Sequence, residues 1–521
     1  MASRQAGVLI PLFSLRSGTD WGVGEIPDLV PFARWAKDAG LSTILLLPAN
    51  EAARGQNSPY FSLSAFAIDP VYVAPEAIPD FQAAGGVDAL SAEERQALAA
   101  ARRAPRVLWH EVRALKRRAF QRAFDRFFAE EWERKTERAR AFQAFVEGER
   151  AWLPDYALFV ALHDLECAGK AWMEWPQPLR ARDPAVLAAA RDRHAREILY
   201  QEWMQWVAEE QWHAARAVAN REGVRLGGDL PFMVAEDSAD VWAHPEDFRT
   251  DAGVGVPPDA FSPTGQNWGF PVYRWPEMQA AGYPWIRERA RRCADLYDLY
   301  RVDHVVGLYR TYYFPKDGSE ARFVPAEEKD QIANGEAVLR ICSEGAQVVA
   351  EDLGVVPEFV RVSLTELGIP GYRVQRWEKN WKEGGDEFLD PAKWPALSVA
   401  TSGTHDTESL ADWYEALPEE ERAQLLALPQ LEGLREREPE RWDDGVRNAL
   451  LELVYSAGSD LALLPFQDLF GARERVNLPG TVSEDNWTYR MPMDMVALAA
   501  DRETRDRLRA LAVETERAPT G

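Results

Sequence analysis

Short apolar runs recur along the chain and alternate with stretches of helical spacing. A short apolar run bounded by turn residues is typical of a buried strand, and apolar residues three and four apart predict an amphipathic helix. The N-terminal part contains both signals, because apolar runs at 7–12 and 41–47 flank a helical pattern over 26–39 that ends at Gly40. A strand-helix-strand unit of this kind predicts parallel strands.

Further apolar runs follow the same pattern, and polar residues stand at most of their C-terminal ends. About eight strands separated by helices is the layout of a (β/α)8 barrel, whose chemistry lies on the C-terminal rim. We therefore predict an α/β fold, a (β/α)8 TIM barrel with inserted subdomains, including a large mostly helical insertion. The expected strands are 7–12, 41–47, 224–229, 299–302, 347–350, 371–377, 396–401 and 461–466.

The stretch from 80 to 222 differs in composition from the rest of the chain. Ala, Arg, Glu and Trp dominate it, Gly and Pro are sparse, and helical periodicity runs through 90–101, 109–147 and 184–220. This is far longer than an ordinary connection between barrel elements. We expect the catalytic barrel to start within 1–79, a helical insertion over 80–222, and the rest of the barrel, with loop insertions, over 223–521. A Gly/Pro-rich connection at 251–269 without regular periodicity is expected to be a functional loop.

Composition narrows the class of partner. The 521 residues contain 60 Lys plus Arg against 84 Asp plus Glu, a net charge of −24, which argues against a nucleic-acid partner. Cys167, Cys293 and Cys342 lie far apart without a Cys-x-x-Cys pattern, which suits a reducing cytoplasm. The N-terminus does not resemble a signal peptide, and no apolar run approaches the roughly 20 residues of a membrane span. We therefore expect a cytoplasmic protein with no membrane partner.

Three carboxyl residues, Asp303, Glu351 and Asp406, end three of the predicted strands. Arg301 lies on the same strand face as Asp303, and a guanidinium beside a carboxylate favours its ionised form. Glu351 follows three apolar residues, and converging carboxylates repel, so Glu351 is the candidate for the protonated partner. A protonated acid facing an ionised nucleophile, about 5–5.5 Å apart, is what retaining glycoside chemistry requires. His405 would hydrogen-bond the same sugar ring.

Other interpretations of the same residues remain open at this stage. Arg301 and Asp303 could be a structural ion pair, and Asp352 and Asp406 could be helix N-caps. His405 and Asp406 could be half of a metal-dependent hydrolase site, with His304 and Asp303 as the other ligands, although further ligands at suitable spacing are missing. Tyr60 and Trp268 could be loop anchors rather than sugar-stacking residues.

Three segments, Arg301-Val-Asp-His, Ala350-Glu-Asp-Leu-Gly and Gly403-Thr-His-Asp, resemble in order the catalytic segments of the amylomaltases. These are the 4-α-glucanotransferases, or disproportionating enzymes, allied to the α-amylase clan. The resemblance covers residues 7 to 492. Longer segments that carry it are Ser58-Pro-Tyr, Gly228-Asp-Leu-Pro-Phe, Val234-Ala-Glu-Asp-Ser-Ala-Asp-Val-Trp-Ala-His-Pro, Gly255-Val-Pro-Pro-Asp-Ala-Phe, Gly265-Gln-Asn-Trp-Gly and Asn477-Leu-Pro-Gly-Thr with Asn486-Trp.

This resemblance implies a covalent β-glucosyl intermediate on Asp303, with Glu351 as acid/base and Asp406 as transition-state stabiliser. It implies α-1,4-glucan transfer between malto-oligosaccharides or starch-like glucans, with no metal or organic cofactor, and a monomer is expected. An α-glucan hydrolase with the same trio is the alternative, and a catalytically silent glucan-binding protein is a further one. The expected substrate-binding residues are Arg301, His405, Tyr60, Asp229, Trp268, Gln266, Ser58 and Asn477.

The sequence also departs from the family pattern at three places. Thr407-Glu408 stands where the family has Asn-Asp, and Gly55-Gln-Asn replaces a segment that usually carries Tyr. Ala260 stands where Tyr is usual. The catalytic trio is intact, so these departures bear on loop contacts and product sizes.

Overall fold

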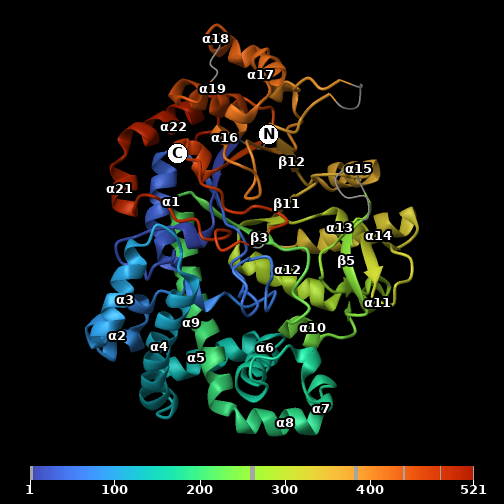
Figure 1. Cartoon of the computed structure of the whole chain (residues 1–521). Coiled ribbons are helices and arrows are strands. Elements are labelled where there is room, and N and C mark those ends of the chain that lie inside the picture. The colour runs from blue at the N-terminus through green and yellow to red at the C-terminus, as the bar shows by residue number, and fades with distance from the viewer. Residues whose placement is uncertain (1–3, 259–264, 381–384, 438–440, 482, 520–521) are drawn as a thin grey trace.

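The computed structural model describes residues 4–258, 265–380, 385–437, 441–481 and 483–519, and its centre is a closed barrel of eight parallel strands (Figure 1). Around the barrel the strands follow the order β1-β14-β13-β12-β11-β8-β3-β2. This confirms the predicted (β/α)8 fold. The strands are β1 (Gln5–Leu9), β2 (Thr43–Leu45), β3 (Arg225–Leu230), β8 (Leu299–Val302), β11 (Gln347–Ala350), β12 (Gly371–Val374), β13 (Ser398–Thr401) and β14 (Leu461–Pro465).

Side chains along each strand point alternately into the barrel and outward, and this alternation decides which residues fill the barrel and which reach its rim. In β8, Leu299 packs inside the barrel in an apolar cluster with Leu45 and Val349, whereas Tyr300 belongs to the larger core outside it. Arg301 is then the next inward position, because side chains alternate along a strand. The lower part of the barrel interior is therefore filled by apolar side chains, mainly leucine and valine. Charged side chains appear near the C-terminal ends of the strands.

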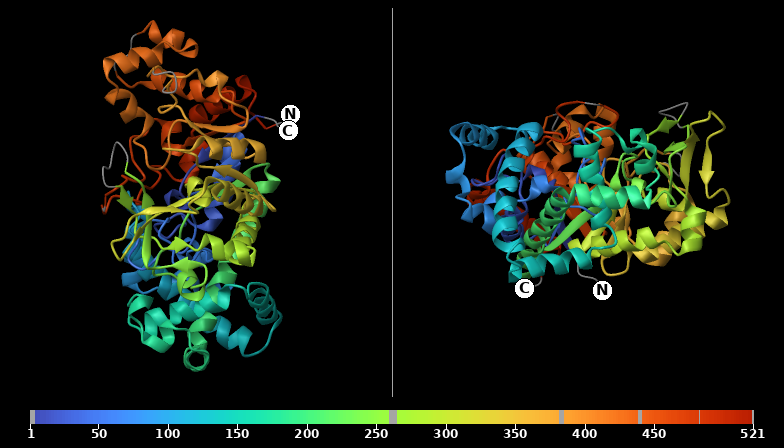
Figure 2. Two further views of the ribbon diagram at one scale, coloured as in Figure 1. Left: turned by 90° about the vertical axis from the view of Figure 1, so that its right-hand side faces the viewer. Right: turned by 90° about the horizontal axis from the view of Figure 1, so that it is seen from below.

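The helical insertion lies between β2 and β3 and forms the lower end of an elongated molecule in the left view of Figure 2. Its longest helix, α9 (Ala195–Arg221), is anchored to the barrel because the Trp212 indole donates to the Leu296 carbonyl oxygen at 2.8 Å. Trp203 on α9 packs against Phe124 and Phe127 of α4 (Trp109–Phe127). The insertion and the barrel thus share one continuous hydrophobic core.

Two predicted helical runs of the insertion are broken in the structure. The run over 109–147 is α4, a π-helical turn at Phe128–Trp132 and a separate α5 (Glu137–Gly148). Lys135 has a φ of 55°, and the Thr136 side chain caps α5, so the backbone turns there although the apolar spacing continues. The run over 184–220 is likewise α8 (Pro184–Arg193) and α9, with His194 between them.

The connection over 251–269 contains strands that were not predicted. β5 (Ala252–Val256) and β6 (Gln266–Asn267) belong to a four-stranded sheet with β9 (Thr311–Pro315) and β10 (Arg322–Val324). The glycines of β5 hid its period-two pattern, and they are needed there: a Cβ on Gly255 would lie 1.8 Å from the Gln266 carbonyl oxygen. Ala260 lies outside the described residues.

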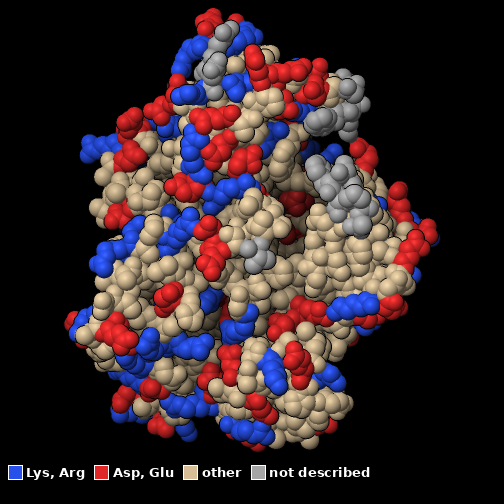
Figure 3. All heavy atoms as spheres, in the orientation of Figure 1, with Lys and Arg blue, Asp and Glu red and all other residues tan. Residues whose placement is uncertain are grey.

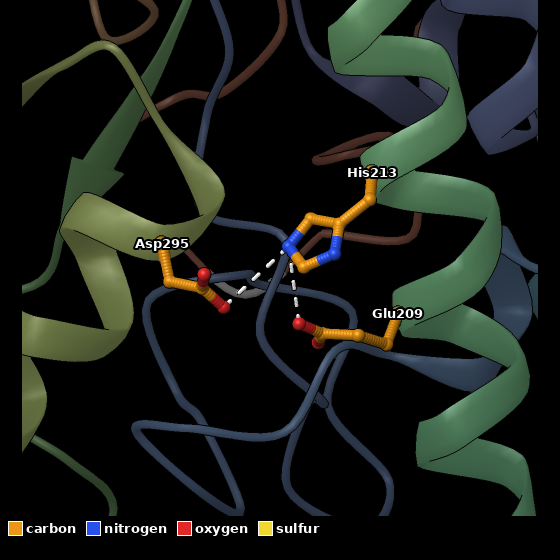
Figure 4. A group of neighbouring side chains, drawn as sticks. All are labelled: Glu209, His213 and Asp295. Carbon is orange, nitrogen blue, oxygen red and sulfur yellow. Dashed lines mark ion pairs between the residues drawn. The ribbon is translucent and has the colours of Figure 1, made fainter. Parts of the chain in front are cut away.

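A charged cluster joins α9 to α12 (Pro284–Leu296) on the outside of the barrel (Figure 4). His213 Nε2 lies 3.1 Å from Glu209 Oε1 and 3.5 Å from Asp295 Oδ2. Arg292 Nη1 approaches Glu209 Oε2 at 2.6 Å and Asp295 Oδ2 at 3.3 Å. The cluster therefore pairs two carboxylates with one arginine and one histidine across the two helices.

No described helix combines the length and apolar character that crossing a lipid bilayer requires. The described C-terminal part is tied back to the barrel, because the buried Arg517 donates to the carbonyl oxygens of Tyr455, Ala457 and Ser459.

Candidate active site

One buried arginine organises the carboxyl groups at the rim of the barrel. The parallel register of β3 and β8 sets Asp229 beside Arg301, and their side chains pair at 2.7 Å. The other Arg301 nitrogen lies 2.8 Å from Asp303 Oδ1 and 3.9 Å from Glu351 Oε2. These two carboxylate oxygens are therefore at most 6.7 Å apart, the two distances taken together. Asp303 and Glu351 face the same guanidinium.

Glu351 is the carboxyl group best placed to hold a proton. Burial raises the pKa of Glu351 to about 8, and the negative charge of Asp303 acts in the same direction, while Arg301 opposes both. Burial also raises the pKa of Asp229. One guanidinium cannot neutralise the three carboxylates of Asp229, Asp303 and Glu351, so this cluster favours a protonated member.

His304 has a backbone conformation that few residues other than glycine adopt, with a φ of 44°. This conformation directs its N–H to Glu351 Oε2 at 2.8 Å, and the Leu353 N–H donates to Glu351 Oε1 at 2.9 Å. The imidazole packs edge-on against Trp268 and Phe232. The turn after β8 therefore fixes the orientation of the Glu351 carboxyl group.

Tyr60 and His405 extend the same polar network to the next strand ends. The Tyr60 hydroxyl donates to Asp229 Oδ2 at 2.7 Å and lies 3.5 Å from His405 Nδ1. The two rings stack with their centroids 5.0 Å apart. Burial lowers the pKa of His405, so its ring is neutral at pH 7. A tyrosine from the loop after β2 is in this way attached to the loop after β13.

Asp406 follows His405 and is held from the opposite side. His405 Nε2 lies 3.5 Å from Asp406 Oδ2, and the Asn477 amide donates to Asp406 Oδ1 at 2.6 Å. Arg475 donates to the Asp406 carbonyl oxygen at 2.6 Å. The Asp406 side chain stays 43% exposed, so one side of it faces solvent.

A cavity of about 210 Å³ is lined by Asp303 and Glu351, whereas Asp406 lies outside its lining. Asp303 and Glu351 form its polar side, and aromatic and other apolar side chains form the remainder, a combination that suits a sugar ring with its apolar face and polar edge. In Figure 3 this face of the molecule is hollowed near its centre, with acidic atoms at the bottom of the hollow. The lining residues are Tyr60, Pro231, Phe232, Met233, Trp268, Phe270, Asp303, His304 and Glu351.

Comparison with known proteins agrees with this geometry. Residues 10–495 match the sequence profile of the family described as 4-alpha-glucanotransferase. The chain is 35% identical to the 4-alpha-glucanotransferase of Thermus thermophilus over 518 residues, which cover 95% of this chain and 96% of that protein. It is 32% identical to the 4-alpha-glucanotransferase of Chlamydia pneumoniae over 518 residues, covering 96% and 94%.

The chain belongs to the 4-α-glucanotransferase family. Among solved structures it resembles an amylomaltase from Streptococcus agalactiae in complex with acarbose, with a TM-score of 0.83, 26% identity and coverage of 99% of this chain and 100% of that chain. Both the family resemblance and the glucan-transferring activity expected from the sequence are confirmed, and transfer is favoured over the hydrolase alternative.

In this 4-α-glucanotransferase the remaining predicted residues lie at different distances from the cavity. Trp268 lines it, and the Trp268 N–H donates to Val254 of β5. The exposed Gln266 accepts from the Trp268 indole at 3.4 Å, so it lies at the N–H edge of that ring. Ser58 is two residues before Tyr60, and its hydroxyl accepts the Tyr60 N–H at 3.4 Å. The predicted set thus splits into residues that line the cavity and residues that support them.

Two of the open alternatives do not fit the structure. Ser409, not Asp406, caps α16 (Leu410–Ala416), and Asp352 accepts from the Tyr372 N–H instead of capping a helix. Among the described residues, the groups whose ligand atoms could surround a metal ion are Glu209 with His213 and Asp295, and His244 with Glu246 and Asp247. Neither group contains Asp229, Asp303, Glu351 or Asp406.

Two contributors to this site were not predicted from the sequence. Phe232 supplies cavity wall and packs on His304, and the Leu-Pro-Phe segment after β3 was the available signal. Arg475 holds the Asp406 backbone across 69 positions of sequence, and no local pattern marks it.

A larger cavity of about 750 Å³ lies elsewhere, between the loop over 51–57 and helices α4 and α9. None of the rim carboxyl residues lines it. The cavity on Asp303 and Glu351 is therefore the candidate active site, since size alone does not supply the chemistry.

Proposed function

We propose that Asp303, Glu351 and Asp406 carry out glucan transfer by a retaining double displacement on α-1,4-glucans. The observation that supports this most directly is the shared contact of Asp303 and Glu351 with Arg301, because it keeps the two carboxyl groups close enough to act on one bond. Asp406, linked to the cluster through His405, is the stabiliser in this proposal.

In the first half-reaction Asp303 attacks the anomeric carbon of the donor glucan. The glycosidic C–O bond breaks as Glu351 gives its proton to the departing oxygen, so the leaving glucan departs as an alcohol. A covalent ester between the sugar and Asp303 remains. The pKa of about 8 for Glu351 suits an acid that must carry its proton at neutral pH.

In the second half-reaction Glu351 acts as the base. It removes the proton from the 4-hydroxyl of an acceptor sugar, whose oxygen attacks the anomeric carbon and releases Asp303 as a carboxylate. Water can take the acceptor's place, which gives hydrolysis as the side reaction. An acceptor held against the apolar wall of Trp268 and Phe232 favours transfer, because it is aligned while bulk water is excluded.

The substrate-binding roles divide between stacking and hydrogen bonding. We assign Tyr60 and Trp268 to contacts with sugar rings. His405, Asn477 and the catalytic carboxyl groups are assigned to hydrogen bonds with sugar hydroxyl groups. Arg301 and Asp229 act mainly by holding the carboxyl groups in place, since both are buried. Ser58 and Gln266 support the two aromatic residues.

The substrates in this proposal are malto-oligosaccharides, maltodextrins and starch-like glucans, used in carbohydrate metabolism by a cytoplasmic monomer. Three buried free cysteines support a reducing compartment. The mechanism calls on protein groups alone for each bond-making step.

Incubation of the enzyme with maltotriose and labelled glucose tests the reaction. Transfer produces a ladder of longer and shorter oligosaccharides, incorporates the label at the reducing end and leaves the number of reducing ends nearly constant. A rise in reducing ends equal to the number of bonds cleaved would instead assign the chain to the hydrolases.

Substitution of the two carboxyl residues tests their roles. Asp303→Asn should lower turnover by roughly 10³-fold or more, since the nucleophile is lost. Glu351→Gln should lose activity on maltotriose but retain the first half-reaction with a maltosyl fluoride, whose leaving group needs no proton. Asp317→Asn, an exposed aspartate in the same connection between β8 and β11, is the matched control and should keep the parent rate. Wild-type turnover in either active-site variant contradicts the assigned role.

A further inference from the structure

The loop that carries Asp406 is held by contacts from two distant segments. It connects β13 to α16, and the Thr407 hydroxyl closes it by accepting the Thr404 N–H at 3.1 Å and donating to the Thr404 carbonyl oxygen at 2.9 Å. Below it, the buried Arg376 donates to the Ser402 carbonyl oxygen at 2.8 Å. These contacts define the path of the loop but none of them reaches the Asp406 residue itself.

Within the loop the Asp406 N–H donates to Thr404 Oγ1 at 3.3 Å, and Arg475 adds a contact from a distant segment. Arg475 Nη2 donates to the Asp406 carbonyl oxygen at 2.6 Å, and its Nε donates to the Asn477 carbonyl oxygen at 3.2 Å. The Asn477 side chain in turn donates to Asp406 Oδ1 at 2.6 Å. One planar guanidinium therefore sets both the backbone of Asp406 and the residue that hydrogen-bonds its carboxylate.

Glu408 completes the arrangement on the other side of the guanidinium. Its Oε2 lies 4.0 Å from Arg475 Nη1, and its Oε1 lies 3.2 Å from Arg376 Nη1. The Glu408 carboxylate thus stands between the two arginines. Its side chain is 39% exposed, so its attraction to Arg475 is screened and secondary to the two carbonyl contacts that Arg475 makes.

We propose that Arg475 is a positioning residue for the reaction, which orients Asp406 and Asn477 together toward the cavity. This inference rests on the proposed role of Asp406. Arg475 donates to the backbone carbonyl oxygens of Asp406 and Asn477, so it acts through these two residues and not on the sugar. A lysine cannot replace it, because a single ammonium group lacks the fixed fork that spans two carbonyl oxygens.

A double-mutant cycle between Arg475 and Asp406 tests the proposal. Transfer is measured with a maltosyl fluoride donor, so that weakly active variants can still be followed. Arg475→Gln should lower kcat by roughly 10- to 100-fold with little change in KM, since a small displacement of the stabilising group affects the transition state more than substrate binding. In the Asp406→Asn background the same substitution should have almost no further effect. Arg475→Lys should recover little of the loss.

Arg473→Gln is the matched control. Arg473 lies two positions away on the same segment and pairs with Asp412 and Glu415 instead of the Asp406 loop. It should retain the parent kcat and leave the cycle unchanged. The melting temperature of each variant is measured alongside, and the activity loss of Arg475→Gln should persist well below its melting transition.

Each other outcome has a distinct meaning. If Asp406→Asn keeps the parent rate, the proposed function of Asp406 is wrong. If Asp406→Asn is impaired but Arg475→Gln is not, or if the two effects multiply independently, Asp406 keeps its role and the positioning role of Arg475 is overturned. An effect confined to KM would also overturn it.

Discussion

The Glu351 side chain is 12% exposed and accepts two backbone N–H groups, whereas that of Asp303 is 24% exposed and lies beside Arg301. Both are carboxyl groups at neighbouring strand ends. The difference in burial and in distance to one guanidinium separates their roles. At the scale of single residues, the proposed chemistry therefore depends on environments that the residue types do not reveal.

The raised pKa of Glu351 gives a testable pH dependence. A general acid must be protonated, so kcat/KM for maltotriose should fall as the pH rises through about 8, where burial and Asp303 hold the Glu351 pKa. The measurement is a pH-rate profile between pH 5 and about 10. With a maltosyl fluoride donor, formation of the covalent intermediate should lose this alkaline limb. An alkaline limb that is identical for both donors would contradict the assignment of Glu351 as the acid.

At the scale of elements, the rim is assembled from loops that different strands project to one end of the barrel. Asp229 comes from β3, Arg301 from β8, and Glu351 and Asp406 from the ends of β11 and β13. The helical insertion does not provide these groups. It contributes core to the barrel through α9, which contains fully buried tryptophans.

Substitution of Trp203 tests how much α9 contributes to the hydrophobic core that the insertion shares with the barrel. Its side chain is fully buried against Phe124 and Phe127, and its indole N–H has no hydrogen-bond partner among the described residues. Trp203→Ala should lower the free energy of unfolding by about 3–5 kcal/mol, because a large cavity remains. Trp203→Phe should cost clearly less, since it loses volume but no hydrogen bond. Chemical denaturation followed by circular dichroism measures both, and equal losses would contradict the packing explanation.

The His213 cluster in Figure 4 links stability to pH. The hydrogen bond with Asp295 and the charge of Glu209 raise the pKa of His213, while burial and Arg292 oppose the shift. A raised histidine pKa contributes stability that is complete below the unfolded value of about 6.5 and is lost as the pH rises through the folded value. His213→Gln should therefore lower the melting temperature at pH 6, by roughly 1 °C for a half-exposed pair, and by less at pH 9.

Thermal denaturation at both pH values checks this prediction. His110→Gln is the control, because His110 is an exposed histidine on α4 and outside the cluster. It removes an imidazole without touching the cluster, so the contribution of the cluster is the difference between the two variants. A loss for His213→Gln that grows with pH would have the wrong sign and would exclude a stabilising protonated His213.

At the scale of the whole molecule, the barrel separates the insertion from the C-terminal helices, and the sheet of β5, β6, β9 and β10 borders the cavity through Trp268 (Figure 2). The chain carries a net charge of −24, and acidic and basic side chains are interspersed on the face drawn in Figure 3. A neutral glucan is neither attracted nor repelled by that charge, so binding depends on the shape and aromatic walls of the cavity.

The proposed chemistry also predicts the effect of chelators on the intact enzyme. Protein groups fill the roles of nucleophile, acid/base and stabiliser, so exhaustive dialysis against EDTA should leave the rate of maltotriose disproportionation within about twofold of the untreated enzyme. Activity is measured before and after dialysis, with and without added divalent cations. A large loss that returns with one cation would point to the metal-dependent hydrolase alternative.

Much of the fold could be predicted from the sequence, because buried strands and amphipathic helices leave periodic patterns in neighbouring residues. The predicted strands 299–302 and 347–350 have the same limits in the structure. Helix breaks at Lys135 and His194 were missed, since backbone turns there interrupt the helices while apolar spacing continues. The glycines of β5 concealed a strand for the opposite reason, because they have no side chains to alternate.

The sequence by itself determined the order of the eight barrel strands along the chain, the barrel class and the position of Asp303, Glu351 and Asp406 after strand ends. Each of these follows from local periodicity and from the rule that parallel strands present their C-terminal ends together. Only the tertiary structure decided how far each carboxyl group is buried, that Arg301 contacts Asp229, Asp303 and Glu351, and that Arg475 binds the Asp406 backbone. Those properties arise from contacts between segments far apart in the chain, and the dielectric surroundings of a side chain exist only once these segments have packed.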